Sequence, residues 1–449
     1  MLSTPLSLFL DVETAFAPDF RRLGEHLPFD WIEQAVAYGG KASIRHRRLP
    51  AEQVVWLVIA LALFRHQSIS EVVDELDLAL PDAAESFVTK SAVTQARGRL
   101  GVEPLKWLFQ TSAQAWSKHN AEQYQFKGLS LQAIDGTTLR TPDSPENRAH
   151  FGAQKYGKDT VASYPQVRGV TVTSVPTHLV LDAVFGPYKT SEAQSAKTLI
   201  PRIADDTLTV FDKGFLSAEI LLGLSAHGKS RHFLIPAKIN TKWTVIEGSD
   251  DDAIVKMKVS ADALKREPSL PKFWQARAIK TIDEKGRVST LLTSLTDRLL
   301  FPAAEVVACY ARRWQVETSY LEIKQTMIGM KHTLRSRTKE GIDQEIYGVL
   351  IAYNLLRTEM AKAAVEANCE PTDISFIRAF HSFQYELHWL AITRAQGKMP
   401  KLLQRLRQRL ILLHDPPRPN RKFDRTVKSK PQRYPYKVSK ATKAAKENP

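Results

Sequence analysis

Three acidic residues lie where a carboxylate could do chemistry. Asp135 ends the apolar run LSLQAID, and Asp212 ends the run LTVFD. In open α/β sheets ligands collect beyond the carboxyl ends of strands, so these two aspartates are expected to lie close together. The third residue, Glu317, occurs in the stretch YARRWQVETSYLEIK. The sequence therefore predicts a site of three carboxylates, although each aspartate alone could equally be a turn or cap residue.

The types of these residues favour a hard divalent metal. Carboxylate oxygens are the ligands that Mg²⁺ and Mn²⁺ prefer, and both ions keep water positions open for a substrate. The chain has two cysteines, no CxxC pair and no HExxH among its 12 histidines, so a zinc site is not indicated. We therefore expect Asp135, Asp212 and Glu317 to bind Mg²⁺, or Mn²⁺ in its place.

Basic and aromatic residues accompany Glu317 at regular intervals. On an ideal helix each residue advances by roughly 100°, so Tyr310, Arg313, Glu317 and Lys324 fall within an arc of about 60°. An apolar arc adjoins this stripe, which predicts a helix that packs on a core and lines a groove with its polar face. The alternative is an ordinary amphipathic helix with a solvated charged face.

The charge of the chain indicates a nucleic-acid partner. The 449 residues carry a formal net charge of +15, with a pI near 9.6. From Pro416 onward eleven Lys and Arg residues against two acidic residues give +9 of that total. We expect this basic tail to be mobile and to bind the phosphate backbone of DNA, with a solubilising tail as the alternative.

The remaining composition indicates a globular protein. The longest apolar run, VVWLVIALALF, is shorter than the ~20 residues that span a bilayer, so it is expected to be a buried helix. No basic-then-apolar signal segment opens the chain, and cysteines are few. These features predict a cytoplasmic location.

The pattern of apolar residues changes along the chain. Helical periodicity continues to about residue 122, and the segment VTKSAVTQARGRLG has the size and polarity of a recognition helix, with Arg97 and Arg99 able to reach a DNA groove. A helical bundle whose arginines face water is the alternative. From about residue 126 short β-rich runs appear, and strands then alternate with helices, which favours a mixed sheet covered by helices.

Further strand-like runs precede a second helical region. They predict an inserted β-rich unit, and helices resume at Pro302. The predicted domains are a helical amino-terminal DNA-binding domain, a first catalytic part, the β-rich insertion, a second, helical catalytic part and the basic tail, over residues 1–122, 123–215, 216–301, 302–412 and 413–449.

Taken together, these motifs resemble those of a known family. AIDGTTLR, TVFDKGF and the array of Tyr310, Arg313, Glu317 and Lys324 occur in the order of the signature of bacterial insertion-sequence transposases of the IS-four group, in the DDE superfamily. The resemblance extends over roughly residues 25 to 395. It implies an α/β chain with an RNase H-like catalytic domain, interrupted by a β-rich insertion and preceded by a helical amino-terminal domain.

The resemblance also implies a reaction. Asp135, Asp212 and Glu317 would hold two Mg²⁺ or Mn²⁺ ions, while Tyr310, Arg313 and Lys324 would hold the DNA. Such an enzyme cleaves DNA at the ends of an insertion sequence and joins the 3′-hydroxyl ends to target DNA, in cut-and-paste transposition. A homodimer would bring the transposon ends together in a synaptic complex, in association with the nucleoid.

The family often places a flipped base on a tryptophan of the β insertion. Trp274 is the candidate for that stacking contact, with Trp243 as the other tryptophan of this region. Two alternatives to a transposase stay open at this point. One is a metal-dependent nuclease or recombinase without strand transfer, and the other is a DNA-binding regulator derived from a transposase.

Overall fold

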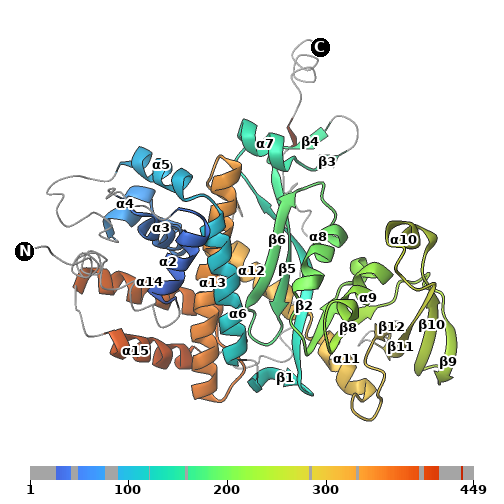
Figure 1. Ribbon diagram of the computed structural model, residues 1–449. Helices are drawn as coiled ribbons and strands as arrows, with labels where there is room; N and C mark the ends of the chain where they lie inside the picture. Colours follow the sequence, from blue (N-terminus) through green and yellow to red (C-terminus); the bar gives the residue numbers. More distant parts are fainter. Residues whose placement is uncertain are drawn as a thin grey trace, which may run out of the picture. The chain divides into compact units, whose positions relative to one another are not determined.

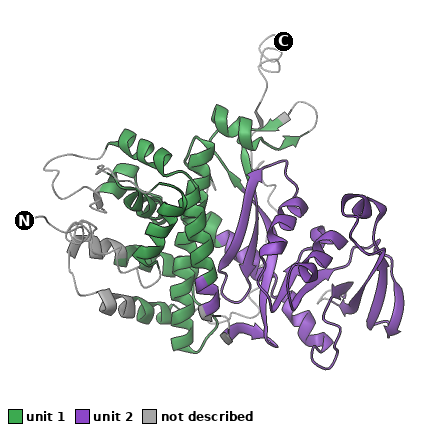
Figure 2. Ribbon diagram, viewed as in Figure 1, with its two compact units in different colours: residues 1–114, 139–167, 322–449 green, residues 115–138, 168–321 purple. Residues whose placement is uncertain are grey.

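The computed structural model describes residues 27–41, 49–75, 89–120, 122–156, 160–282, 286–329, 333–393, 399–413 and 436–437. The chain forms two compact units (Figure 2). Unit 1 comprises residues 1–114, 139–167 and 322–449, and unit 2 comprises residues 115–138 and 168–321. The predicted basic tail lies outside the described residues, except for Leu413 and the short strand β13 (Tyr436–Lys437).

Unit 1 is mainly helical (Figure 1). Its helices are α2 (Phe29–Tyr38), α3 (Ala51–Leu63), α4 (Ile69–Glu75), α5 (Lys90–Leu100), most of α6 (Glu103–Asn120), α7 (Pro145–Phe151), the π-helix η5 (Glu322–Met327), α13 (Lys339–Ala367), α14 (Phe376–Thr393) and α15 (Met399–Leu412). A small sheet of β3 (Lys155–Tyr156), β4 (Thr160–Ala162) and β13 completes it.

Two helices form the centre of unit 1. The apolar run noted in the sequence lies within α3 up to Leu63, every residue of α3 from Gln53 to Ala60 is buried, and most of the residues of α13 are buried as well. The two helices approach closely at Gly348, since a Cβ atom there would lie 2.7 Å from Cγ1 of Val58. A glycine is therefore required for this packing. As expected for a buried core, this apolar run packs against protein.

Unit 2 is built on a large mixed sheet. Its strand order is β6 (Val180–Pro187), β5 (Gln166–Ser174), β2 (Leu129–Arg140), β7 (Thr207–Phe211), β8 (Arg231–Pro236), β12 (Val288–Thr293), β11 (Phe273–Ile282), β10 (Asp252–Lys258) and β9 (Thr244–Gly248), and β1 (Gln125–Phe126) pairs with β2. Strands β2, β7 and β8 are parallel, whereas the strands from β12 to β9 are antiparallel to their neighbours. The α/β class predicted from the sequence is confirmed.

Helices cover both faces of this sheet. They are α8 (Glu192–Leu199), η3 (Ile200–Arg202), η4 (Lys213–Phe215), α9 (Ala218–Ala226), α10 (Ala261–Arg266), α11 (Ala303–Ala311) and α12 (Trp314–Leu321). Neighbouring residues on one strand point to opposite faces. Phe211 accordingly joins the apolar cluster of α8 and α9, and Val210 joins the cluster of α11 and α12. Strand β7 is therefore buried on both faces.

The segment predicted as a β-rich insertion continues this same sheet. The predicted boundary at residue 216 falls just before α9 and β8, and β8 extends the parallel block by pairing with β7. The antiparallel strands β9 to β12 follow, and β12 pairs with β8 through Leu292 and Ile235. Helix α9 forms the crossover between the parallel strands β7 and β8, so β8 belongs to the same parallel block as the strands before it.

Within the described ranges, no helix combines the length and the apolar character that crossing a bilayer requires.

Candidate active site

Asp135 and Asp212 lie side by side on neighbouring parallel strands. The pairing of β2 with β7 ends at Ile134 and Phe211, and each of these residues is followed directly by an aspartate. Adjacent strands in a sheet lie about 4.8 Å apart, so the two side chains emerge at the same level of the sheet. The structure thus brings together two carboxylates that are 77 residues apart in the sequence.

The two aspartates nevertheless differ in local structure. The expectation that Asp135 ends its strand is wrong, because β2 continues to Arg140. The residues that follow, Thr137 to Leu139, suit an extended strand. Asp212, in contrast, does end β7, and its Oδ2 accepts a hydrogen bond from the N–H of Gly214 at 3.4 Å. This bond caps the short helix η4.

The helical segment that carries Glu317 is not continuous. Helix α11 ends at Ala311, and Arg313 N–H donates to the carbonyl of Tyr310 at 3.0 Å, a tightened i to i+3 bond. Helix α12 then runs from Trp314 to Leu321 and is followed by a π-helical turn, in which Ile328 N–H donates to the carbonyl of Ile323. The single straight helix predicted from the sequence is therefore wrong.

This change in helical geometry alters the predicted stripe. Tyr310, Arg313 and Glu317 lie in unit 2, at the junction of α11 and α12. Lys324 lies within the π-helical turn of unit 1 and is partly buried. The angles of an ideal α-helix do not apply across such a turn. The structure therefore does not support the expectation that Lys324 lies in the same arc of about 60° as the other three residues.

Arg313 forms an ion pair with Glu317. Its Nη2 donates to Glu317 Oε1 at 3.2 Å, and its side chain is 11% exposed. Its Nε is buried without a hydrogen-bond partner. Burial alone would lower the pKa of Arg313. The neighbouring acidic groups have the larger combined effect and raise the pKa above its ordinary value; they are Tyr310, Asp135, Glu317 and Asp212. The guanidinium is therefore held charged within an acidic group.

The electrostatics of Asp135 show that the acidic residues interact. Burial raises the pKa of Asp135 to about 6, and the charges of Asp212 and Glu317 add to this increase. A hydrogen bond from the N–H of Gly136 and the charge of Arg313 act in the opposite direction. Like-charged neighbours disfavour ionisation. The three carboxylates consequently form one electrostatic group, partly neutralised by Arg313.

The donor set of this group fits a hard divalent cation. Three carboxylates supply the oxygen ligands that Mg²⁺ and Mn²⁺ prefer, and the repulsion between them would be relieved by a positive ion. Within the described ranges, however, no three His, Cys, Asp or Glu side chains are gathered closely enough to hold a metal. The charges of Asp212 and Glu317 act on Asp135, but the three side chains would have to move closer together to bind an ion.

Tyr310 lies beside this group. Its side chain is partly buried, and burial raises the pKa of its hydroxyl above the ordinary value. The charge of Arg313 opposes that shift, and the charges of Asp212 and Glu317 add to it. Tyr310 is therefore a neutral hydroxyl next to the acidic residues.

The two arginines predicted to reach a DNA groove differ in their surroundings. Arg97 on α5 donates from Nε to Gln344 Oε1 at 3.0 Å and from Nη2 to the carbonyl of Gly341 at 3.2 Å. These bonds, together with its partial burial, give Arg97 a structural role within unit 1. Arg99, two residues later, is exposed. Of the two, Arg99 alone presents its side chain to solvent.

Trp274 does not lie on a surface. It is 8% exposed and belongs to the apolar cluster under α8 and α9, with its ring centroid 6.0 Å from that of Phe233. A base could not stack on this ring without opening the core. The expected stacking role of Trp274 is therefore not supported by its position, and Trp243 packs against the same cluster.

Sequence reasoning overlooked an exposed tryptophan. Trp314 is 64% exposed, and the guanidinium carbon of Arg313 lies 5.2 Å from the centroid of its ring. It occurs within YARRWQVETSYLEIK, one residue after Arg313, but the search for aromatic residues was directed to the β insertion. The sequence does contain a signal for it, because Trp314 is a large apolar residue at a helical position where the pattern predicts a polar, exposed side chain.

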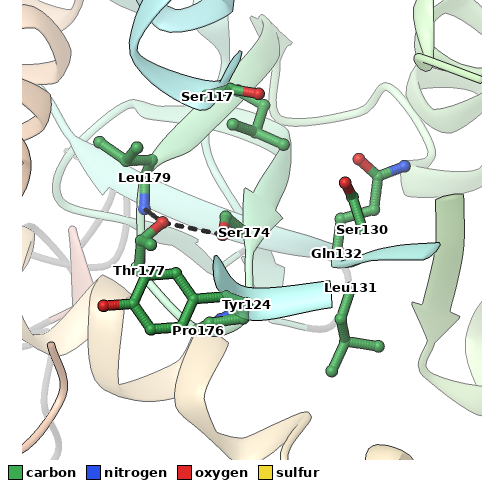
Figure 3. Close-up of a pocket in the computed structure, with 10 residues that line it drawn as sticks. Ser117, Tyr124, Ser130, Leu131, Gln132, Ser174, Pro176, Thr177 and Leu179 are labelled. Carbon is green, nitrogen blue, oxygen red and sulfur yellow. Dashed lines mark hydrogen bonds between the residues drawn. The ribbon is translucent and has the colours of Figure 1, made fainter. Parts of the chain in front are cut away.

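A small cavity in unit 2 lies away from these residues. It measures about 40 Å³ and is lined by neutral side chains, namely Ser117, Tyr124, Ser130, Leu131, Gln132, Ser174, Pro176, Thr177, Leu179 and Leu181 (Figure 3). Thr177 donates to Ser174 Oγ across it at 2.8 Å. Ligand sites usually enclose ~300 Å³ or more. This cavity has room for a few water molecules and is not the candidate site.

Comparisons with known proteins relate the chain to transposases. Residues 18–110 match the family model described as insertion element 4 transposase N-terminal, and residues 127–355 match the transposase DDE domain. The chain is 39% identical over 426 residues to transposase InsG for insertion sequence element IS4 of Escherichia coli (strain K12), which covers 94% of this chain and 95% of that protein. It is 38% identical to InsZ of the same strain over 234 residues, 51% of this chain and 76% of InsZ.

A solved structure is also similar. It is a piggyBac transposase synaptic complex with hairpin DNA, at a TM-score of 0.40 and 11% identity, over 90% of this chain and 87% of that chain.

The chain belongs to the insertion element 4 family of DDE transposases. It is therefore an enzyme that acts on DNA, with an RNase H-like catalytic fold and a general dependence on divalent metal ions. The resemblance noted in the sequence is confirmed.

Proposed function

We propose that this transposase cuts DNA at the ends of an insertion sequence and joins the freed 3′-hydroxyl ends to target DNA by two-metal phosphoryl transfer. The observation that carries the proposal is the pairing of Ile134 with Phe211, which sets Asp135 beside Asp212. The charge of Glu317 acts on Asp135 as well. Asp135, Asp212 and Glu317 would hold two Mg²⁺ or Mn²⁺ ions.

The metal ions and the protein would have different tasks. Bound in pairs, such ions stabilise the attacking and the leaving oxygen of an in-line phosphoryl displacement. The protein supplies the carboxylates in their ionised form, so Asp135 must release its proton, which its pKa of about 6 allows at neutral pH. No covalent intermediate with the enzyme is required.

Arg313 is proposed to exchange partners when DNA binds. Without DNA its guanidinium contacts Glu317, and its Nε–H has no acceptor. A phosphate oxygen near the scissile bond would satisfy that donor and draw the guanidinium from Glu317, freeing the carboxylate. Arginine binds phosphate through two parallel hydrogen bonds, which also fixes the direction of the backbone.

Other residues are proposed to hold the DNA. Tyr310 and the exposed ring of Trp314 border Arg313, and Lys324 follows on the next helical turn. An aromatic face accepts bases of any sequence, and a lysine neutralises a phosphate. Arg99 would contact DNA from the amino-terminal helices. A homodimer would provide one active site for each transposon end.

The test uses the purified full-length protein and a DNA fragment that carries the ends of the element. With Mg²⁺ we expect cleavage at the ends, free 3′-hydroxyl groups and joined products in a target plasmid, and with EDTA none of these. Asp135→Ala, Asp212→Ala and Glu317→Ala should each abolish cleavage and keep specific binding in a gel-shift assay.

A glutamate on the neighbouring helix provides the control. Glu305 on α11 pairs with Lys127 at 3.0 Å, so Glu305→Ala should cleave like the unaltered protein. Cleavage by Glu317→Ala at the unaltered rate would contradict the assignment of the site. Cleaved ends that are never joined to target DNA would favour a nuclease over a transposition reaction.

A further inference from the structure

Tyr320 connects the helix of Glu317 to the strand of Asp135. Its hydroxyl donates to the main-chain carbonyl of Asp135 at 2.7 Å, and it also lies 2.9 Å from Oγ1 of Thr171 on β5. The side chain is 8% exposed and stands three residues after Glu317 on α12. One buried hydroxyl thus joins α12 to β2 at the residue that carries a proposed metal ligand.

The hydrogen atoms of this contact can be assigned. A hydroxyl has a single hydrogen, and a carbonyl can only accept, so Tyr320 must donate its hydrogen to the carbonyl of Asp135. Thr171 must then donate to Tyr320. Because the hydrogen of Thr171 is used there, Thr173, at 3.0 Å from it, must donate to Thr171. The result is one directed chain from Thr173 through Thr171 and Tyr320 to the Asp135 carbonyl.

The bond constrains the backbone of Asp135. The carboxylate of the same residue accepts a hydrogen bond from the N–H of Gly136 at 2.8 Å, so both its carbonyl and its side chain are held. Helix α12 is held at its buried face by Val316 and Tyr320, which belong to the cluster shared with β2 and β7. Apolar contacts hold the helix against the sheet, but they permit sliding along it. A hydrogen bond of defined length and direction prevents such sliding.

We propose that Tyr320 is a positioning residue that sets the distance between Glu317 and Asp135 for metal binding. This inference rests on the proposed function, in which both carboxylates hold the ions. Groups that orient metal ligands without touching the metal typically change its affinity by 10- to 100-fold when they are removed. The hydroxyl of Tyr320 would act in this way through the backbone of Asp135 and through α12.

The experiment compares three variants of the full-length protein without DNA. Mn²⁺ binding is measured from the electron paramagnetic resonance signal of the free ion, beside a thermal melt. Tyr320→Phe keeps the ring and removes the hydroxyl, and we expect its Mn²⁺ affinity to fall by roughly tenfold. Specific binding to transposon-end DNA in the absence of metal should remain unchanged.

Ser319→Ala is the matched control. Ser319 is a fully buried hydroxyl on the same helix, and it donates to the carbonyl of Val316 at 2.7 Å within α12. Its removal should lower the melting temperature as much as Tyr320→Phe does and leave Mn²⁺ affinity unchanged. Unchanged Mn²⁺ affinity in a folded Tyr320→Phe protein would overturn the inference.

Glu317→Gln separates this inference from the proposed function. A loss of Mn²⁺ affinity in Glu317→Gln but not in Tyr320→Phe overturns the role of Tyr320 alone. Unaltered Mn²⁺ binding by Glu317→Gln overturns the metal site and the inference with it. If Tyr320→Phe does not fold, Tyr320→Met takes its place, because a flexible apolar side chain fills much of the same space without a hydroxyl, and unchanged Mn²⁺ affinity in that variant overturns the inference.

Discussion

The guanidinium of Arg313 lies 3.2 Å from the carboxylate of Glu317, one helical turn further along the chain. The contact neutralises part of an acidic group and at the same time occupies an oxygen that a metal ion would need. Its two partners differ in exposure, since the side chain of Glu317 is 42% exposed and that of Arg313 is 11% exposed. Arg313 is therefore the more firmly held of the two.

Arg313→Ala should leave the protein folded and abolish most of the cleavage. Because the Arg313 side chain is 11% exposed and offsets the charge of the carboxylates, its removal should destabilise the fold by about 1–3 kcal/mol, which a protein of this size tolerates. Arg313→Lys should also be impaired, because a point charge cannot replace a two-pronged phosphate contact. A thermal melt and a cleavage assay on transposon-end DNA check both variants.

Arg312 supplies the control for this prediction. It is the exposed neighbour of Arg313, at the end of α11. Arg312→Ala should affect cleavage less than Arg313→Ala does. Unaltered cleavage by Arg313→Ala would remove the residue from the proposed DNA contact.

Asp135→Asn should stabilise the metal-free protein at pH 8. Folding raises the pKa of Asp135 from 3.8 to about 6, so the folded state holds the proton more tightly than the unfolded state. The free energy of unfolding therefore falls as the pH rises from 3.8 to about 6, and it stays lower above that range. Asparagine removes this cost, with an expected gain on the order of 2 kcal/mol at pH 8 and little change at pH 3.5.

Urea unfolding in EDTA at both pH values measures this effect. Asp182 offers a comparison, because it is an aspartate of strand β6 that pairs with Arg202 at 2.7 Å. Asp182→Asn loses that pair and should not gain stability at pH 8. Equal stability of Asp135→Asn and the unaltered protein at pH 8 would show that the acidic group does not strain the fold.

Trp314→Ala should weaken binding to transposon-end DNA without affecting folding. The ring is mostly exposed, so its loss should change stability by no more than about 0.5 kcal/mol. Stacking on an aromatic ring contributes roughly 1–3 kcal/mol per base, which corresponds to a loss of about 5- to 150-fold in affinity. Trp314→Phe should recover part of the affinity that Trp314→Ala loses.

Fluorescence anisotropy with labelled end DNA measures these affinities. Leu321, at the end of the same helix, is 51% exposed and provides an apolar control. Leu321→Ala should bind DNA like the unaltered protein. An unchanged affinity in Trp314→Ala would mean that this ring does not meet DNA.

Removing residues 416–449 should weaken DNA binding in general and reduce its dependence on salt. The segment carries +9, and each phosphate contact adds close to one unit to the slope of log affinity against log salt. The preferred sequence should stay the same, since contacts to phosphate do not read bases. Titrations at several salt concentrations check this, and an unchanged slope would leave the tail a solubilising role.

The sequence by itself determined the family and named the candidate residues of the site. Asp135, Asp212 and Glu317 each occur in a short motif whose residue types are local features, and the order of strands and helices follows from apolar periodicity. The strands before Asp135 and Asp212 and the helical segment of Glu317 were therefore predictable. A helical amino-terminal region was predictable for the same reason, since its periodicity runs over many residues.

Tertiary structure alone decided the geometry around these residues. The pairing of Ile134 with Phe211, the bonds of Arg97 to residues about 245 positions away and the burial of Trp274 all depend on contacts between distant segments. The break between α11 and α12 likewise escapes a helical pattern, because periodicity records spacing along a segment and not the backbone angles at one residue. The bond from Tyr320 to Asp135 spans 185 residues, and only the packed core brings its two atoms together.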